Sequence, residues 1–308
     1  MRPPDIHAPP QPQRGVAVVT ALLLTALVAV LVSGMVWSQH VSIRRLENQG
    51  AALQLRWIAR GGLEWARLIL SGDARSSSVD HLGEPWAAGL SRTPLSEALL
   101  DAYAASSESL GEISGRMTDL QGRFNVDRLN RSGRVDPDAL AILTALVQRA
   151  GGSPEDAERF AARFVAASQP AALAAGQPWI EAGQLAAAPE LQAAWPQLAD
   201  HVTWLPRATR INVNTAGAAV LAAALPDVSE SDVRSLIDSR DQAHLRNVSE
   251  IGQRLGDGTA NIPTQILSTD SRYFLVEGEI RYGRLTRRFD WVIERNGRAS
   301  QVLWQRES

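Results

Sequence analysis

The sequence predicts an α+β fold in which a long N-terminal helix leads into a small antiparallel sheet interrupted by a large inserted all-α domain. Three observations predict this fold. An uncharged apolar run occupies residues 16–37, an Ala-rich helical pattern occupies the middle of the chain, and alternating strands follow near the C-terminus. With 308 residues, of which 45% are hydrophobic and 21% charged, the chain can bury a substantial core.

Composition and motifs argue against several classes of function. The net charge of -2 argues against a protein that binds nucleic acid by neutralising phosphates. The chain contains no cysteine, and its five histidines are scattered, so we predict no metal site and no thiol chemistry. It also lacks the GxSxG and HExxH motifs, a Walker-type glycine loop and a dinucleotide fingerprint. We therefore predict that it is not an enzyme.

The N-terminal region combines a polar, Pro-rich stretch with an apolar one. Residues 1–15 are weakly basic, and Val16–Trp37 carries no charge over a length that can cross a membrane as a helix. A signal peptide would have a shorter apolar run and a small-x-small cleavage site, which Ser33-Gly34-Met35 matches poorly. A plain membrane anchor and a cleaved leader both remain.

The dipeptide Arg14-Gly15, directly before the apolar helix, resembles the end of a type IV prepilin leader. In that family a membrane peptidase cuts after the glycine and the new N-terminus is methylated, so we expect cleavage between Gly15 and Val16. Pilin-like proteins mostly carry Glu as the fifth mature residue, where this chain has Thr20. That carboxylate can neutralise the terminal ammonium of a neighbouring subunit. A subunit at the tip has no such neighbour, although a protein outside this class would also lack the Glu.

The N-terminal helix is expected to continue beyond the membrane. No proline occurs from His40 to Leu70, and apolar residues recur there at helical spacing. Gly61-Gly62 weakens the helix, and Ser71-Gly72-Asp73 is the expected stop. The predicted segments are thus a leader at residues 1–15, a membrane half at 16–38 and a periplasmic half at 39–72.

Residues 73–132 form the first part of the predicted α+β domain. We expect a loop-rich stretch, a short helix near residues 94–104 capped by Ser91 or Thr93, and a strand at Glu112–Thr118. A turn is expected at Asp119–Gly122.

The inserted α-domain is predicted at residues 133–268. Asp136-Pro137 and Ser153-Pro154 are typical helix starts, and Gly151-Gly152 separates the two helices. Further helices are expected near residues 179–185, 190–198, 216–225 and 229–239.

Residues 269–308 are predicted to complete the sheet. Alternating apolar residues indicate strands at Tyr273–Tyr282 and Leu285–Ile293, and a third strand contains Val302 and Trp304. Asn296-Gly297 is a strong hairpin signal between the last two. One strand before the insertion and three after it are therefore expected.

Four short motifs, in order along nearly the whole chain, resemble the minor pseudopilin family of general secretion pathway protein K, from type II secretion. These are Gln13–Val16, Thr118–Val126, Arg210–Ala216 and Ser271–Phe274. The resemblance implies a pseudopilin fold and a place at the pseudopilus tip, with a tip complex of other minor pseudopilins as partners. It also implies processing by prepilin peptidase, contact with secreted substrate proteins, and an inner-membrane anchor with a periplasmic domain.

The resemblance also raises the question of calcium, which relatives can bind through acidic residues after the second helix of the α-domain. Here that stretch is Arg163–Pro170, and no carboxylate lies between Glu158 and Glu181. Calcium prefers six or more oxygen ligands, several of them anionic. We therefore predict no cofactor, with calcium in the α-domain as the alternative. Asp119 and Asp127 are candidate ligands, but turn and cap roles suit them better. The remaining acids suit helix caps and solvated faces: Asp227, Glu230, Asp232, Asp238 and Asp241.

The segment Ile211–Leu221 also resembles a helix-hairpin-helix DNA-binding module. Such modules offer backbone N–H groups of a Gly-rich hairpin to phosphate, whereas the turn Leu225–Ser229 has no Gly, includes Pro226 and adds an acid. Asn212 and Asn214 are instead predicted to be turn and cap residues, and no nucleic-acid partner is predicted.

The predicted function is a structural subunit that starts pseudopilus growth and supports export of folded proteins. Two alternatives are a membrane-anchored binding module that never joins a filament and a DNA-uptake protein. Residues 46–63 of the long helix are the expected contact surface for partner subunits, because their apolar residues exceed one narrow stripe.

Overall fold

A computed structural model describes residues 14–95, 111–168, 185–256, 262–283 and 285–308, with side chains from Ala17 onward. The chain divides into two compact units, Met1–Arg56 and Trp57–Ser308. The described part of the first unit belongs to helix α1 (Arg14–Ser76), which continues into the second unit. Among the described residues, Ala17–Ser76 is the one helix long and apolar enough to cross a membrane. Its apolar side chains are exposed from Val18 to Trp37, which suggests a membrane anchor.

Helix α1 extends through Gly61-Gly62 and past the predicted stop, ending at Ser76. The Ser71-Gly72-Asp73 signal is therefore wrong by about one turn. At the last residue of the helix, the Ser76 hydroxyl donates a hydrogen bond to the Asp73 carbonyl at 3.0 Å. This bond competes with continuation of the helix.

The second unit contains a five-stranded antiparallel sheet in the order β1-β2-β9-β10-β11. The strands are β1 (Leu90–Pro94), β2 (Gly111–Asp119), β9 (Tyr273–Tyr282), β10 (Leu285–Asn296) and β11 (Ala299–Glu307). Two strands thus precede the insertion where one was expected. The Ser91 and Thr93 caps are wrong because these residues lie in β1 together with Pro94, the expected first residue of the helix. Residues 96–104 of the predicted helix lie outside the described part.

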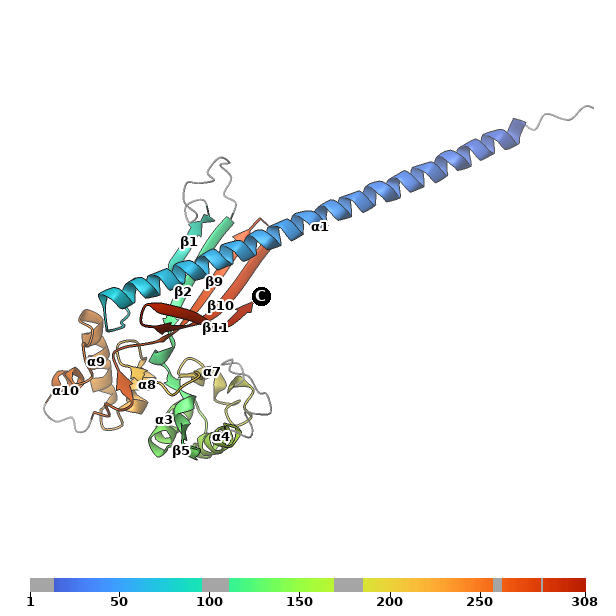
Figure 1. Ribbon diagram of the computed structural model, residues 1–308. Coiled ribbons are helices and arrows are strands. Elements are labelled where there is room, and N and C mark those ends of the chain that lie inside the picture. Colours follow the sequence, from blue (N-terminus) through green and yellow to red (C-terminus); the bar gives the residue numbers. More distant parts are fainter. Residues whose placement is uncertain (1–13, 96–110, 169–184, 257–261, 284) are drawn as a thin grey trace, which may run out of the picture. The chain divides into compact units, whose positions relative to one another are not determined.

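The C-terminal end of α1 packs on one face of the sheet (Figure 1). Ala66 and Leu70 are buried, and a Cβ at Gly62 would lie 3.5 Å from Ile113 Cδ1. Arg67 donates to the Ser300 carbonyl at 2.6 Å, so the helix also holds β11. Small residues on this face of α1 allow the close approach.

The inserted helices lie beyond the end of the sheet where β2 ends and β9 begins (Figure 1). The main helices are α3 (Pro137–Arg149), α4 (Pro154–Ala167), α8 (Ala218–Ala224) and α9 (Glu230–Gln242). Two shorter ones are α7 (Trp195–Leu198) and α10 (Glu250–Leu255). Short 3-10 helices η1 (Leu120–Gly122) and η2 (Val126–Leu129) lead from β2 toward them. The short strands are β3 (Phe124–Asn125), β4 (Asn130–Arg131), β5 (Arg134–Val135), β6 (Val202–Thr203), β7 (Ile211–Asn212) and β8 (Leu267–Ser268).

The predicted starts of the first two inserted helices are present. Asp136 caps α3 by accepting from the N–H groups of Asp138 and Ala139, and Ser153 forms a capping box with Asp156 at the start of α4. Gly151 has a φ of +85°, a backbone conformation that residues with a side chain rarely adopt. A glycine in this conformation is a common end to a helix, here α3. The expected helix at residues 190–198 is reduced to α7, and the one at 179–185 falls almost entirely outside the described residues.

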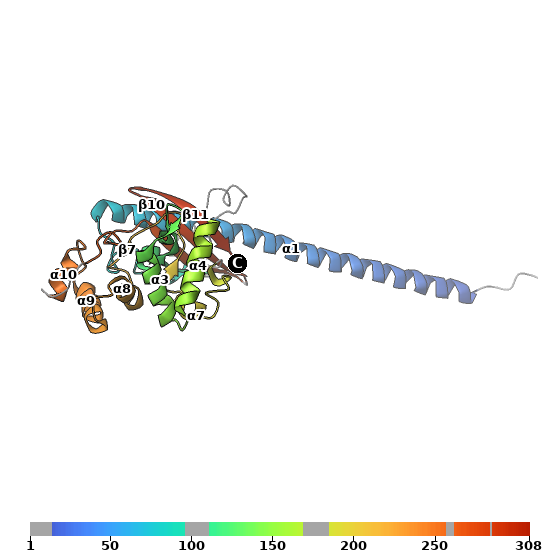
Figure 2. The same cartoon turned by 90° about the horizontal axis from the view of Figure 1, so that it is seen from below.

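The α-domain has its own apolar core, in which α3 packs against α4 and α8 (Figure 2). Leu143, Leu146 and Val147 of α3 are completely buried, as are Leu221 of α8 and Leu267 of β8. The particular domain boundaries given by the sequence stay predictions, but the fold class is confirmed.

Candidate functional site

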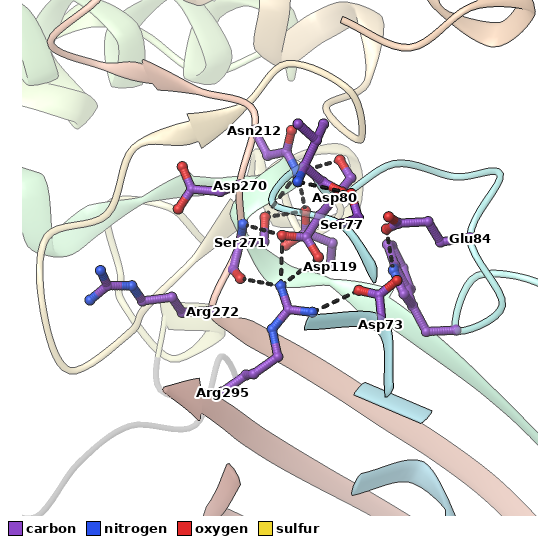
Figure 3. Close-up of polar contacts among 12 residues, drawn as sticks. Asp73, Ser77, Asp80, Glu84, Asp119, Asn212, Asp270, Ser271, Arg272 and Arg295 are labelled. Atoms are coloured by element: carbon purple, nitrogen blue, oxygen red, sulfur yellow. Dashed lines mark hydrogen bonds and ion pairs between the residues drawn. The ribbon is translucent and has the colours of Figure 1, made fainter. Parts of the chain in front are cut away.

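Three of the four resemblance motifs meet where the sheet joins the α-domain. Thr118–Val126 contains the end of β2, Arg210–Ala216 contains β7, and Ser271–Phe274 enters β9. A set of buried polar side chains, here called the junction cluster, lies among them (Figure 3). Its members are Asp73, Asp80, Glu84, Asp119, Asn212, Ser271 and Arg295.

Asp119 lies at the centre of this cluster and is buried. Its Oδ2 accepts hydrogen bonds from Ser271 Oγ at 2.6 Å, Thr215 Oγ1 at 2.6 Å and Asn212 Nδ2 at 3.0 Å. Its Oδ1 accepts from the Gln121 N–H at 2.8 Å and so caps η1. Burial raises the pKa of Asp119, and these hydrogen bonds act in the opposite direction. One carboxylate therefore joins β2, the α-domain and the start of β9.

Asn212 and Asn214 connect the α-domain segments rather than cap helix α8. The Asn212 amide donates to the Asp80 carbonyl at 3.1 Å and to Asp119, while its oxygen accepts from the Asn214 N–H at 3.0 Å. Asn214 pairs with the Leu245 backbone through both its oxygen and its nitrogen. Helix α8 instead begins at Gly217 with no side-chain cap. The predicted turn role is therefore confirmed, and the predicted cap role is wrong.

Arg295, from β10, links the end of α1 to the loop that follows it. Its guanidinium donates to Asp73 Oδ2 at 2.8 Å, to both oxygens of Asp80 at 2.5 and 2.7 Å, and to the Ser271 carbonyl at 2.9 Å. It also lies over the Phe274 ring, 4.9 Å from the centroid. Burial raises the pKa of Asp80 to about 7, although Arg295 and the Ser271 N–H favour its ionised form.

The motif Thr118–Val126 also contacts the neighbouring segments through the Gln121 side chain and through Gly122. Gln121 accepts from the Arg272 N–H at 2.8 Å and donates to the Arg210 and Asp270 carbonyls at 3.3 Å. A Cβ at Gly122 would lie 2.9 Å from the Thr215 carbonyl oxygen. Only glycine permits this approach without displacing the Thr215 backbone. Gln121 therefore bonds the neighbouring segments, and Gly122 allows them to lie close to the end of β2.

The members of the junction cluster are buried and hold segments of the chain together. Asp119 is occupied by four donors, and Arg295 by the acceptors described above. A buried polar network that is nearly satisfied in this way fixes one arrangement of its surroundings. Its chemistry is therefore structural, connecting α1, the sheet and the α-domain.

The predicted processing residues Gly15 and Val16 lie in the first turn of α1. The structure provides no test of cleavage between them, which stays a prediction.

The predicted calcium stretch is described only as far as Ser168. Arg163 faces Glu190 in a bidentate pair with two bonds of 2.8 Å, so this part of α4 carries a compensated charge. Among the acids assigned to caps and surfaces, Glu230 pairs with Arg149 at 2.7 Å and the Asp232 N–H donates to the capping Ser229. Calcium binding in the α-domain stays an open alternative.

Helices α8 and α9 occupy the positions of the helix-hairpin-helix resemblance. The first turn of α9 carries Glu230 and Asp232. Two carboxylates at a helix N-terminus occupy the place where such modules accept a phosphate. This charge disfavours DNA on this surface.

The sequence did not indicate Asp73, Asp80 or Arg295. Asp73 resembled part of a helix stop, Asp80 lies in a loop, and Arg295 directly precedes the Asn296-Gly297 turn. Each is separated from its partners by a long stretch of chain, and no local pattern reports such pairing. Asp119, Asn212 and Ser271 lie in motifs that resemble the family. The sequence did not predict that these three residues contact one another.

Comparison with known proteins agrees with this architecture. A family model described as type II secretion system protein K matches residues 211–269, which include β7 and β8. Type II secretion system protein K of Pseudomonas aeruginosa is 28% identical over 300 residues, covering 88% of this chain and 85% of that protein. The Klebsiella pneumoniae protein of the same name is 27% identical over 258 residues, covering 74% and 75% of the two chains.

A solved structure gives the same fold. A chain in the crystal structure of the GspK-GspI-GspJ complex from the enterotoxigenic Escherichia coli type 2 secretion system matches with a TM-score of 0.67. The two sequences are 21% identical, and the match covers 86% of this chain and 99% of the other. The architecture thus defines a pseudopilin fold with an inserted α-domain. Within that class, the resemblance to the type II secretion protein K family is confirmed.

Proposed function

We propose that this chain is a minor pseudopilin at the tip of a type II secretion pseudopilus. In this role it starts assembly with other minor pseudopilins and supports the export of folded periplasmic proteins across the outer membrane. The observation that carries the proposal is the likeness, over most of both chains, to a structure solved as a complex with GspI and GspJ. The function is structural, and no catalytic role is proposed.

The inserted α-domain supports a tip position. It is attached to the end of the sheet by buried contacts, including the Asp119–Asn212 and Asp119–Thr215 hydrogen bonds. A subunit carrying an additional packed domain would collide with its neighbours inside a closely packed helical filament, whereas the tip leaves space on one side.

Thr20 is compatible with the same position. Its hydroxyl donates to the Ala17 carbonyl at 3.0 Å, within the helix. A threonine whose hydroxyl bonds within its own helix adds no charge to the membrane segment.

Exposed aromatic and aliphatic side chains on α1 offer a surface for partner subunits. Trp57, Trp65 and Leu68 are exposed by 72%, 47% and 64%, and they recur at helical spacing. We call these three residues the α1 stripe. Large exposed apolar groups on one helical face are typical of protein interfaces. The stripe extends the predicted contact surface, residues 46–63, toward the end of the helix.

The proposed location is the inner membrane, crossed once by α1, with the sheet and the α-domain in the periplasm. Prepilin peptidase removes residues 1–15 and the new N-terminus at Val16 is methylated. The apolar first half of α1 supports the anchor, and Arg14-Gly15 supports the cleavage.

Intact mass and N-terminal sequencing of the protein recovered from membranes test the proposal. With the secretion system expressed, we expect a chain that begins at Val16 and is heavier by one methyl group. Replacing Gly15 with a bulkier residue should block this maturation, and Arg14→Ala should not. A chain that starts at Met1 in the presence of an active prepilin peptidase would contradict the proposal and favour a plain membrane-anchored module.

A further inference from the structure

A cavity opens on the α-domain where the first half of α3 meets the end of α8, and we call it the α3–α8 pocket. Its volume is about 220 Å³. Ile142 of α3, Leu225 directly after α8 and Ile266 before β8 line it, and all three are buried. They also belong to the apolar core of the α-domain, so they form an apolar floor that is continuous with this core.

The rim of the α3–α8 pocket is polar and acidic. Asp138, Asp227 and Gln265 line it and are exposed, so the pocket is open to solvent on this side. Within the described parts of the chain, neither carboxylate forms an ion pair or accepts a hydrogen bond, and Asp138 acts on Arg128 only at a distance. The two carboxylates give the rim a negative charge that a basic partner would complement.

The size of the pocket selects an aromatic side chain. A cavity of about 150 Å³ accepts benzene, whereas pockets for drug-sized ligands begin at about 300 Å³. The α3–α8 pocket, at about 220 Å³, therefore admits one aromatic ring and little else. An apolar surface surrounded by a polar rim is typical of sites that bind another protein.

The order of floor and rim determines where the basic groups of the partner lie. A charged group that entered the pocket first would lie against Ile142 and Leu225, where the loss of its hydration is unfavourable. An aromatic ring loses no such hydration and gains from leaving water. The basic groups therefore belong to the residues on either side of the ring, where they meet Asp138 and Asp227 at the exposed rim.

We propose that the α3–α8 pocket binds an exposed segment of another protein in which an aromatic residue has basic residues on both sides. The ring fills the pocket, and the basic side chains pair with the two carboxylates of the rim. The pocket shares no residue with the junction cluster or with the α1 stripe. The proposal does not depend on the proposed secretion role.

Short peptides provide the test. The full chain in detergent is added to an Arg-Phe-Arg peptide whose ring carries one fluorine, and empty detergent micelles are the blank. We expect the chain to broaden the fluorine NMR signal beyond the blank, with a dissociation constant of about 1 mM or tighter. Excess unlabelled Arg-Phe-Arg should reverse the broadening. Arg-Ala-Arg and Glu-Phe-Glu should compete about tenfold more weakly, since the first lacks the ring and the second has the same charge as the rim.

Variants of the chain locate the binding. Ala141→Leu places a larger apolar side chain in the pocket and should reduce binding by about tenfold or more, whereas Ala162→Leu, at an exposed position of α4, should not. Replacing Asp138 and Asp227 together with Asn should weaken binding by about threefold or more, with a smaller effect at high salt. Asp238→Asn, at an exposed position of α9, is the control for charge and should leave binding unchanged.

The comparison of peptides uses the unaltered chain, so it decides the question even if a variant fails to fold. The proposal is overturned if Arg-Phe-Arg broadens no more than in the blank, or if either comparison peptide competes equally. Undiminished binding by folded Ala141→Leu would place the peptide elsewhere on the chain and would also overturn it. None of these measurements involves cleavage or partner subunits, so a failure here leaves the proposed secretion role unaffected.

Discussion

At the scale of single residues, Asp119 shows how one side chain can connect segments distant in sequence. It receives hydrogen bonds from Thr215, which lies within the insertion, and from Ser271, which directly follows it. A hydrogen bond to a buried charged group contributes more than one between neutral groups. If these donors are removed, the buried Asp119 carboxylate is left unsatisfied, and the folded state loses stability.

We predict that Asp119→Ala destabilises the chain by about 3 kcal/mol or more, because several buried donors lose their acceptor together. Thermal or denaturant unfolding in detergent, followed by circular dichroism, measures the change. Asp200→Ala is the control, since the Asp200 side chain is 89% exposed and its ion pair with Arg123 is long, at 3.7 Å. Equal effects of the two substitutions would show that the junction cluster does not hold the fold.

Asp80 predicts a dependence of the free energy of unfolding on pH. Its pKa is raised from 3.8 to about 7 in the folded chain, so the folded state binds a proton more tightly than the unfolded state does. The corresponding stability is present below about pH 4 and is lost as the pH rises through about 7, by at most about 4 kcal/mol. Denaturant unfolding measured across this range of pH should show the decline.

The same measurement on Asp80→Asn separates this effect from other titrations. The variant has a lower baseline because Arg295 loses an ionised partner, but its stability should vary less with pH. An unchanged slope would mean that a group other than Asp80 takes up the proton.

At the scale of secondary structure, β9 and β10 pair around a space made by glycine. A Cβ at Gly278 would lie 2.1 Å from Phe289 Cζ, and Phe289 in turn stacks on Trp291 with ring centroids 3.9 Å apart. The aromatic ring therefore covers the position that a side chain would take. A glycine generally weakens the interior of a strand, whereas in this sheet Gly278 provides the space for Phe289.

We predict that Gly278→Ala lowers stability by about 2–3 kcal/mol, because Phe289 has to leave its position in a packed sheet face. Thermal unfolding of the detergent-solubilised chain provides the measurement. Gly72→Ala is a matched control within α1, where a Cβ meets nothing within 4 Å. That substitution should raise stability by about 0.5–1 kcal/mol through helix propensity, and a loss there would contradict this account of the two glycines.

Elements with strong local signals could be predicted from the sequence. The caps at Asp136 and Ser153 and the Asn296-Gly297 hairpin depend on chemistry within a few residues, and all are present. Strand β1 was not predicted, because Ser91, Thr93 and Pro94 resemble the capped start of a helix. Its place at the sheet edge, beside β2 alone, permits a proline that a central strand would not.

The candidate site was harder to predict than the fold. Motif resemblance indicated Asp119 and Asn212 but not that they touch, because their contact depends on how the insertion returns to the sheet. Arg295 and Asp80 are 215 residues apart in the chain. Pairing across such a separation follows from the completed topology and leaves no trace in local spacing.

At the scale of the whole molecule, the α1 stripe makes a prediction about assembly. Replacing Trp57 and Trp65 together with alanine should reduce copurification with the partner minor pseudopilins by about tenfold or more, since buried tryptophans commonly dominate binding energy. Both side chains are exposed in the single chain, so its thermal stability should change little.

Leu82→Ala is the control for this experiment. Leu82 is also exposed, by 54%, but lies in the loop after α1 and outside the stripe. An equal loss of copurification in this variant would show that general surface hydrophobicity, and not the stripe, governs assembly.

The interrupted sheet has a consequence for the order in which the chain folds. Asp119 and Ser271, which bond at the junction, are separated by 152 residues, and β2 must wait for β9 before its pairing is complete. Closing a flexible loop of that length is entropically unfavourable. An insertion that has already folded brings its two ends together and shortens the effective loop. A chain emerging N-terminus first would therefore complete the sheet last, and until then the unpaired edge of β2 would depend on protection from aggregation.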